Sequence, residues 1–192
     1  MDISILWESF VRRGDRTSFE ALFNCCYKGL YQYGFKLIQD HQLIDDCIQD
    51  LFFELWTGRD HLPEVESVKG YLFRALRYKL LRETRKEARL EVFNEGNHDQ
   101  WEISHEAFLI DREKDYALRK QLEHFLQQLS PRQQEAITLR FNNQMTYEEI
   151  SSVMSISYQG VVNLIYKSLK YLRENMVTLS AMIMLCSWYQ FT

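Results

Sequence analysis

The chain contains few residues that interrupt helices. Only 2 prolines and 7 glycines occur among its 192 residues, whereas turn-rich β folds use many of both. Hydrophobic residues make up 46% of the sequence and aromatic residues 14%, which argues against global disorder and allows a real core. The composition therefore predicts an all-α fold built from long helices.

The sequence also lacks the usual patterns of disulfide, metal and catalytic chemistry. No nucleophile elbow, phosphate-binding loop or His-Glu-x-x-His cluster is present, so we expect no enzyme activity, no cofactor, no metal and no small-molecule substrate. No signal peptide precedes the first helix, which predicts a cytoplasmic protein with reduced thiols. None of the 4 cysteines forms a Cys-x-x-Cys pair: Cys25, Cys26, Cys47 and Cys186.

Positive charge is scarce overall but concentrated locally. The formal net charge of -4 argues by itself against nucleic-acid binding. Residues 66–90 are nevertheless strongly basic, while residues 40–65 and 91–124 are acidic. Such asymmetry predicts different partners for different faces, although plain solvated helix surface explains many charge runs.

Hydrophobic periodicity divides the chain into two small helical domains joined by a flexible acidic linker. We expect a first domain at 1–90, a linker at 91–112, and a second domain at 113–176. The apolar tail, 177–192, is short for a membrane span of about 20 residues. We expect it to fold onto the second domain as a helix or strand, with a docking segment as the alternative.

The second domain contains the pattern of a helix-turn-helix. Thr146 and Glu149 form a capping box that predicts a first helix, and Ser155-Ile156 makes the turn before a second helix capped by Ser157. The buried stripes are Ile150, Val153 and Met154 on the first helix, and Val161, Ile165, Ser168 and Leu172 on the second. Both caps, the turn and a partly polar second helix favour DNA binding over a plain helical hairpin.

Three separated segments resemble one family. Residues 46–56, DCIQDLFFELW, resemble the helix with which bacterial sigma factors grip the RNA polymerase clamp. Residues 68–82, VKGYLFRALRYKLLR, look like the helix that engages the promoter minus-ten element. Residues 129–141, LSPRQQEAITLRF, and the helix-turn-helix are similar to the domain that reads the minus-thirty-five element. In this order they resemble an extracytoplasmic-function sigma factor over roughly residues 10–175.

The resemblance implies a polymerase-binding surface on the acidic helix. Three- and four-residue spacing places its members on one band, where a polar rim beside aromatic anchors suits a protein interface. Core packing is the alternative for the two aromatic residues. The band consists of Asp46, Gln49, Asp50, Phe53 and Trp56.

The basic helix is implied to bind and melt the minus-ten element. Its cations can neutralise phosphates and its aromatic rings can stack on unpaired bases. In the family a loop before this helix holds a flipped base, and the matching stretch 59–67 is acidic here. Core packing is equally plausible for Tyr71. The candidate residues are Lys69, Tyr71, Arg74, Arg77, Tyr78, Lys79 and Arg82.

The helix-turn-helix is implied to read the minus-thirty-five element. Gln159 and Asn163 are candidates for base-edge hydrogen bonds, and Val162 could touch a thymine methyl. Val162 and Leu164 stand where the family commonly has basic or polar residues, and Tyr166 is also unusual. These departures predict weak intrinsic DNA binding. The candidate residues are Arg140, Tyr147, Ser157, Tyr158, Gln159, Val162, Asn163 and Lys167.

The sequence thus predicts an RNA polymerase sigma factor that directs core RNA polymerase to promoter DNA. An autonomous helix-turn-helix regulator that dimerises on symmetric operators is the alternative, and a helical adaptor that binds only protein is a third hypothesis. A membrane-bound anti-sigma factor is a further partner implied by the resemblance alone.

Overall fold

The computed structural model describes residues 2–91, 120 and 122–189, and these contain helices and connections but no strand. The all-α prediction is therefore confirmed. The first domain consists of α1 (Ile3–Arg13), α2 (Arg16–Leu37), α3 (His41–Thr57), the 3-10 turn η1 (Arg59–His61) and α4 (Val68–Glu91). The second domain contains a helical stretch at 122–127, α6 (Pro131–Ile137), the π-helical turn η3 (Thr138–Asn142), α7 (Tyr147–Met154) and α8 (Tyr158–Tyr189).

Aspartate caps set the starts of the first three helices. The carboxylates of Asp2, Asp15 and Asp40 each accept a backbone N–H from the first turn of the helix that follows. These bonds satisfy amides that have no partner inside the helix. Gly14 ends α1 with φ 65°, a left-handed conformation that glycine adopts without a steric penalty.

The core of the first domain lies where α1, α2, α3 and α4 pack together. Gly34 on α2 permits the close approach of α3, because a Cβ there would lie 3.0 Å from Cγ2 of Ile44. Side chains from all four helices are buried in this core, among them Phe10, Leu22, Leu30, Ile48, Leu72, Leu76 and Leu80.

The second domain is organised by the packing of α6 and α7 against α8. The predicted capping box of α6 is present, with the side chain of Gln133 accepting the N–H of Ser130 over 3.0 Å. A small apolar cluster of Leu129, Ile137 and Leu172 joins the 122–127 stretch to α6 and α8. The linker stays a prediction, because residues 92–119 lie outside the described part of the chain.

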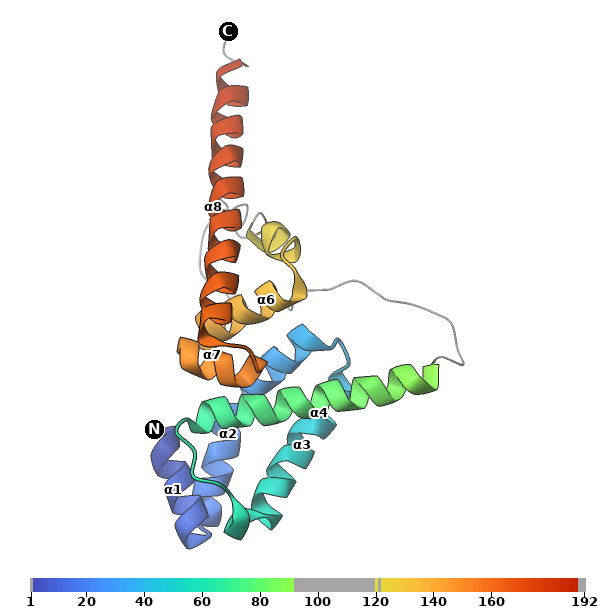
Figure 1. Cartoon of the computed structure of the whole chain (residues 1–192), viewed down its shortest axis with the longest axis vertical. Helices are drawn as coiled ribbons and strands as arrows, with labels where there is room; N and C mark the ends of the chain where they lie inside the picture. Colours follow the sequence, from blue (N-terminus) through green and yellow to red (C-terminus); the bar gives the residue numbers. More distant parts are fainter. Residues whose placement is uncertain (1, 92–119, 121, 190–192) are drawn as a thin grey trace.

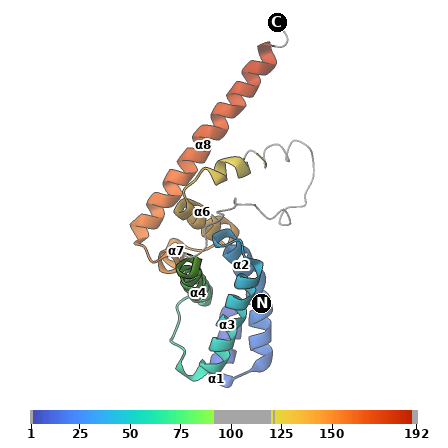
Figure 2. The same cartoon turned by 90° about the vertical axis from the view of Figure 1, so that its right-hand side faces the viewer.

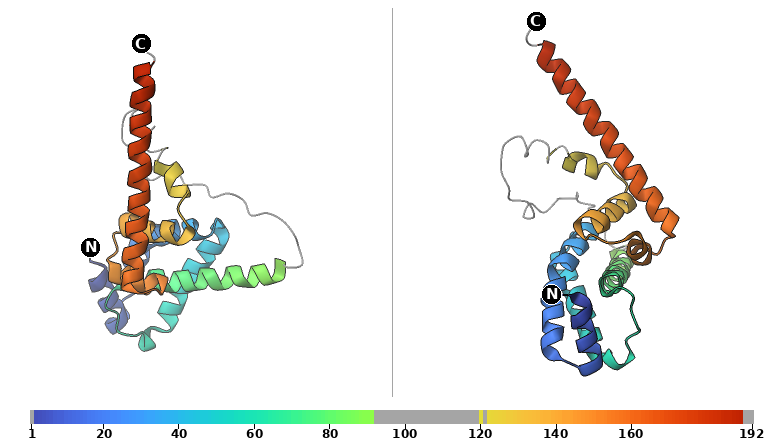
Figure 3. Two further views of the ribbon diagram at one scale, coloured as in Figure 1. Left: turned by 45° about the horizontal axis from the view of Figure 1, so that its top comes forward. Right: turned by 90° about the vertical axis from the view of Figure 1, so that its left-hand side faces the viewer.

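The two domains are docked against each other. α4 of the first domain packs along α7 of the second, and the side view shows α6 and α7 over the tops of α2 and α4 (Figure 3). One continuous apolar core contains buried residues of both domains, including Leu76 from α4 and Ile150 from α7. Hydrophobic periodicity predicts the two domains but not this docking.

The apolar tail continues α8 and does not fold back onto the second domain. α8 is a single helix of 32 residues that ends at Tyr189, and its C-terminal part extends away from the other helices (Figures 1 and 2). Residues 161–189 contain neither proline nor glycine, so no helix-breaking residue interrupts this part of α8. None of the helices in the described part of the chain has the length and apolar character needed to span a membrane.

Candidate polymerase- and DNA-binding surfaces

The acidic helix α3 buries one face and exposes the other. Ile44, Ile48 and Leu55 are among its buried residues. All five residues predicted to bind polymerase lie on the exposed face: Asp46, Gln49, Asp50, Phe53 and Trp56. We call these five residues the α3 band.

The two aromatic residues of the α3 band differ in their contacts. The side chain of Phe53 is 67% exposed, so it does not contribute to the core. Trp56 is 41% exposed, and its ring centroid lies 5.0 Å from that of Phe19 and 6.0 Å from that of Phe10. Trp56 therefore supports the packing of α1 and α2 and also contributes apolar surface to the band.

The outward face of α4 is strongly basic. Arg74, Tyr78 and Arg82 are exposed, and Arg85, which was not among the predicted residues, lies on the same face. The sequence could have predicted Arg85 as a member of this face, because it lies one helical turn after Arg82 within the basic run.

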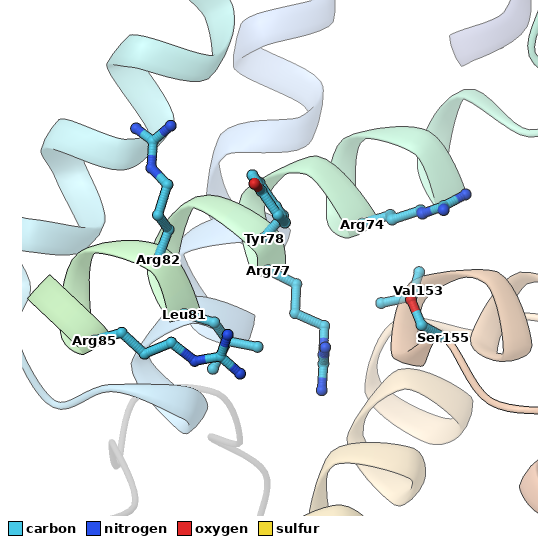
Figure 4. Close-up of a pocket in the computed structure, with 8 residues that line it drawn as sticks. All are labelled: Arg74, Arg77, Tyr78, Leu81, Arg82, Arg85, Val153 and Ser155. Carbon is cyan, nitrogen blue, oxygen red and sulfur yellow. The ribbon is translucent and has the colours of Figure 1, made fainter.

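A cleft of about 500 Å³ separates this face of α4 from the end of α7 (Figure 4). Arg74, Arg85 and Tyr78 line it from α4, while the guanidinium group of Arg82 points away from α7 (Figure 4) and that of Arg77 is paired with Glu135. α7 contributes only neutral side chains. Such a cleft attracts phosphate oxygens. Its lining residues are Arg74, Arg77, Tyr78, Leu81, Arg82, Arg85, Val153 and Ser155.

Lys79 does not reach the basic face. Its side chain is buried against α3, and its Nζ lies 2.6 Å from Oε1 of Glu54. The sequence placed Lys79 among the DNA contacts because charge alone does not show which face of α4 it occupies. Its position instead assigns it to the packing of α3 against α4.

Two more cations of α4 are engaged by the second domain. Arg77 forms an ion pair with Glu135 of α6, with 2.7 Å between Nε and Oε1. Lys69 donates a hydrogen bond from Nζ to the backbone carbonyl of Asn143. Their positive charge is therefore directed at the second domain in this arrangement.

Tyr71 is half-buried beside α1. Its ring centroid lies 5.6 Å from that of Trp7 in an edge-to-face arrangement, and burial raises the pKa of its phenol above the usual value. These contacts favour the core interpretation of Tyr71 that the sequence left open.

The loop before α4 carries little positive charge. Arg59, its one arginine, pairs with the adjacent Asp60 over 2.9 Å within η1. Ser67 closes the loop by accepting the N–H of Gly70 at the start of α4. The loop itself therefore offers little attraction for phosphate, as its acidic sequence predicts.

The helix-turn-helix has the predicted caps and turn. Thr146 and Glu149 form the capping box of α7, and Ser157 accepts the N–H of Gly160 over 3.1 Å at the start of α8. Ser155 makes the turn in the left-handed region, with φ 53°. Every residue of the two predicted apolar stripes is buried, as the periodicity required.

The start of α8 presents a polar edge to solvent. Gln159 and Asn163 are exposed and joined by a hydrogen bond of 3.1 Å. Ser157, Tyr158 and Lys167 are exposed on the same helix or its cap, whereas Val162 is half-buried. This edge has the shape and the amide groups that base-edge readout needs.

Arg140 and Tyr147 lie together at the side of this edge. The guanidinium carbon of Arg140 is 5.1 Å from the ring centroid of Tyr147, and Nη1 donates to the carbonyl of Met145 over 2.7 Å. The ring of Tyr147 also contacts that of Tyr158 edge to face, with centroids 5.8 Å apart. These contacts fix the cation and both rings in position.

Comparisons with known proteins identify the family of both domains. Residues 22–90 match the family of sigma-70 region 2, and residues 119–172 match that of sigma-70 region 4. The chain thus belongs to the sigma-70 family and is a sigma factor of RNA polymerase. The pairing of regions 2 and 4 confirms the predicted assignment to the extracytoplasmic-function sigma factors.

Solved structures share the fold at low sequence identity. The sigma factor RpoE of Bartonella quintana, solved with the anti-sigma factor NepR, has 20% identity and a TM-score of 0.65, covering 81% of this chain and 94% of that one. CnrH, solved with the cytosolic domain of CnrY, has 20% identity and a TM-score of 0.59, covering 92% and 99%. No curated protein sequence matches the chain.

Proposed function

We propose that this sigma factor uses three separate surfaces in transcription initiation. The α3 band binds core RNA polymerase. The outward face of α4 binds and melts the minus-ten element, and the start of α8 reads the minus-thirty-five element. The observation that carries the proposal is the exposure of Phe53 between the acids of the α3 band. A regulator that only bound DNA would need no such apolar residue on an acidic face.

The α3 band suits a protein partner. Burial of its exposed aromatic surface in an interface is favourable, because apolar surface leaves water. Its carboxylates and amide can form specific ion pairs and hydrogen bonds with the partner. Asp46, Asp50 and Gln49 are free to meet a basic surface of polymerase, since they lie on the outside of the domain.

The residues that contact the minus-ten element in this proposal are mainly Arg74, Tyr78 and Arg82, together with Arg85. Arginines bind phosphates in a bidentate manner, and an exposed phenol ring can stack on an unpaired base. Lys79 is left out of this set because it is buried beside Glu54. Lys69 and Arg77 can take part only when the second domain releases them.

The minus-thirty-five role falls on the polar edge of α8. Gln159 and Asn163 can each pair with an adenine edge in the major groove. Arg140, Tyr147, Ser157, Tyr158 and Lys167 surround them as candidate backbone contacts, and Val162 is left as a candidate for a thymine methyl. With few cations on this edge, binding would depend on delivery by polymerase.

An anti-sigma factor is a further proposed partner. RpoE of Bartonella quintana was solved in complex with the anti-sigma factor NepR, and CnrH was solved in complex with the cytosolic domain of CnrY. By likeness, this chain would be held inactive by such a protein, and a membrane-bound one is the form that the family resemblance implies.

The polymerase interface can be tested by co-elution and affinity measurement with bacterial core RNA polymerase. We expect wild type to bind, and we expect Asp50→Arg and Phe53→Ala to weaken binding by roughly thirtyfold or more, as interface anchors do. Glu20→Arg, a charge reversal on the exposed part of α2, is the matched control and should bind normally.

Failure of a folded wild type to bind core polymerase would contradict the proposal. Protection of a symmetric DNA site by the chain alone would then favour an autonomous regulator. Absence of DNA binding even with polymerase present would favour a helical adaptor.

A further inference from the structure

The contact between the two domains is centred on a buried carboxylate. Glu135 of α6 is only 7% exposed. The hydroxyl of Tyr33 on α2 donates to its Oε1 over 2.8 Å, and Arg77 on α4 donates through Nε over 2.7 Å and through Nη2 over 3.3 Å. Two helices of the first domain thus converge on one acid of the second.

The electrostatics of this group depend on the docking. Burial and the charge of Glu135 raise the pKa of Tyr33 well above its usual value, so its hydroxyl remains a donor. Burial alone would lower the pKa of Arg77, but the hydrogen bond and charge of Glu135 raise it. A buried acid with two such donors is satisfied only in this geometry.

Two further polar contacts fix the orientation of the domains. The hydroxyl of Ser67 donates to Oε1 of Glu149 over 2.5 Å, and Lys69 donates to the carbonyl of Asn143. Together with the apolar core shared by α4 and α7, they give one specific docked arrangement. Residues 28 and 142 are exposed at its edge.

The docked arrangement is too short for a promoter. Elements centred near minus ten and minus thirty-five are separated by about 25 base pairs, which at about 3.4 Å each is roughly 85 Å of duplex. Here α4 and α7 are in direct contact. Residues 92–119 could span at most about 100 Å at about 3.5 Å each, so separated domains can reach both elements.

We propose that Glu135 is the centre of an intramolecular latch that holds the free chain closed and competes with DNA for Arg77 and Lys69. This inference rests on the proposed function of α4. Opening frees two cations for phosphates and allows the domains to part. A partner that binds the open form shifts the equilibrium by its differential affinity.

Closure can be measured in the full chain without polymerase or DNA. Two dyes are attached to cysteines introduced by Lys28→Cys and Asn142→Cys, in a chain whose Cys25 and Cys186 are changed to serine. The dyes lie close together in the docked form, because the Cβ position of the neighbouring Gly29 is 3.8 Å from Nδ2 of Asn143. Single-molecule energy transfer then counts closed and open molecules. We expect wild type to be mostly closed.

Charge reversal should open the latch. Glu135→Lys places a cation against Arg77, and we expect the ratio of closed to open molecules to fall roughly tenfold or more. Glu148→Lys, the same change at an exposed position of α7, should leave the ratio unchanged. The double variant Arg77→Glu with Glu135→Lys should restore closure, and Tyr33→Phe should weaken it less than Glu135→Lys does.

Competition with DNA can be measured on a 20-nucleotide oligothymidylate. Each phosphate contact adds about 0.7 to the slope of log affinity against log salt for single strands. Freeing Lys69 and Arg77 should therefore steepen the slope for Glu135→Lys by up to about 1.4 relative to Glu148→Lys. A bis-maleimide bridge between the cysteines introduced at positions 28 and 142 should prevent this increase.

The outcomes separate the latch from the proposed function. Low energy transfer in wild type, or equal ratios for the variants at 135 and 148, would overturn the latch, and so would a folded Glu135→Lys chain that the Arg77→Glu change does not rescue. Equal salt slopes would overturn the competition with DNA. Opening of the Glu135→Lys chain without any oligonucleotide binding by the open molecules would refute the proposed role of α4 and leave the latch in place.

Discussion

Lys79 Nζ lies 2.6 Å from Oε1 of Glu54, and this ion pair ties α4 to α3 inside the first domain. The charged end of a lysine within a basic run is expected at the DNA, yet the side chain of Lys79 is 9% exposed while that of Glu54 is 64% exposed. The lysine stem packs against the core and its ammonium group reaches the surface at Glu54. Lys79 therefore acts in folding.

Substitution of Lys79 should affect stability more than DNA binding. We expect Lys79→Ala to lower the free energy of unfolding by about 1–2 kcal/mol, since the packed stem is lost while Glu54 stays solvated. Urea denaturation measures this change. Arg82→Ala is the comparison, and it should leave stability unchanged while weakening binding to oligothymidylate; the reverse pattern would place Lys79 at the DNA.

The turn of the helix-turn-helix should favour glycine. Ser155 occupies the left-handed region with φ 53° and ψ 48°, where a Cβ is unfavourable by about 1–2 kcal/mol. We expect Ser155→Gly to raise the midpoint of thermal unfolding and Ser155→Val to lower it. Equal midpoints for the two variants would show that the turn relaxes out of this conformation.

Promoter readout should depend on Gln159 and Asn163. Removal of a bidentate amide contact typically costs about 1–3 kcal/mol and relaxes the preference at one base pair. We expect Gln159→Ala and Asn163→Ala each to weaken binding of the polymerase complex to sites that wild type selects from a random library. Lys170→Ala, a change farther along α8, serves as control, and unchanged selection by both alanine variants would contradict the assignment.

The neighbouring thiols Cys25 and Cys26 should react very differently. Burial raises the pKa of Cys26 to about 12, so at pH 8 about one molecule in ten thousand carries the reactive thiolate. Cys25 is exposed. We expect iodoacetamide at pH 8 to label Cys25 and to spare Cys26 until urea unfolds the chain, as read by tandem mass spectrometry; equal labelling of the folded protein would exclude the burial of Cys26.

Local features of this protein were predictable because their causes are local. The capping boxes at Thr146 and Ser130 and the apolar stripe of α7 each depend on residues three or four positions apart. Exposure of the α3 band follows in the same way, since burial of one helix face leaves the other outside. These patterns, together with the ordered resemblance, were enough to predict two helical domains and a sigma factor.

The tertiary structure decided which charged side chains are engaged inside the protein and which remain exposed for binding partners. Tyr33 and Glu135 are 102 positions apart and meet through the packing of separate helices, and the same packing directs Arg77 and Lys79 to different partners. Periodicity shows which face of a helix is apolar, but it does not show which other helix covers that face. The sequence by itself thus determined the helices, caps and family, while only the three-dimensional arrangement decided the docking of the domains and the pairing of their charges, because those depend on contacts between distant parts of the chain.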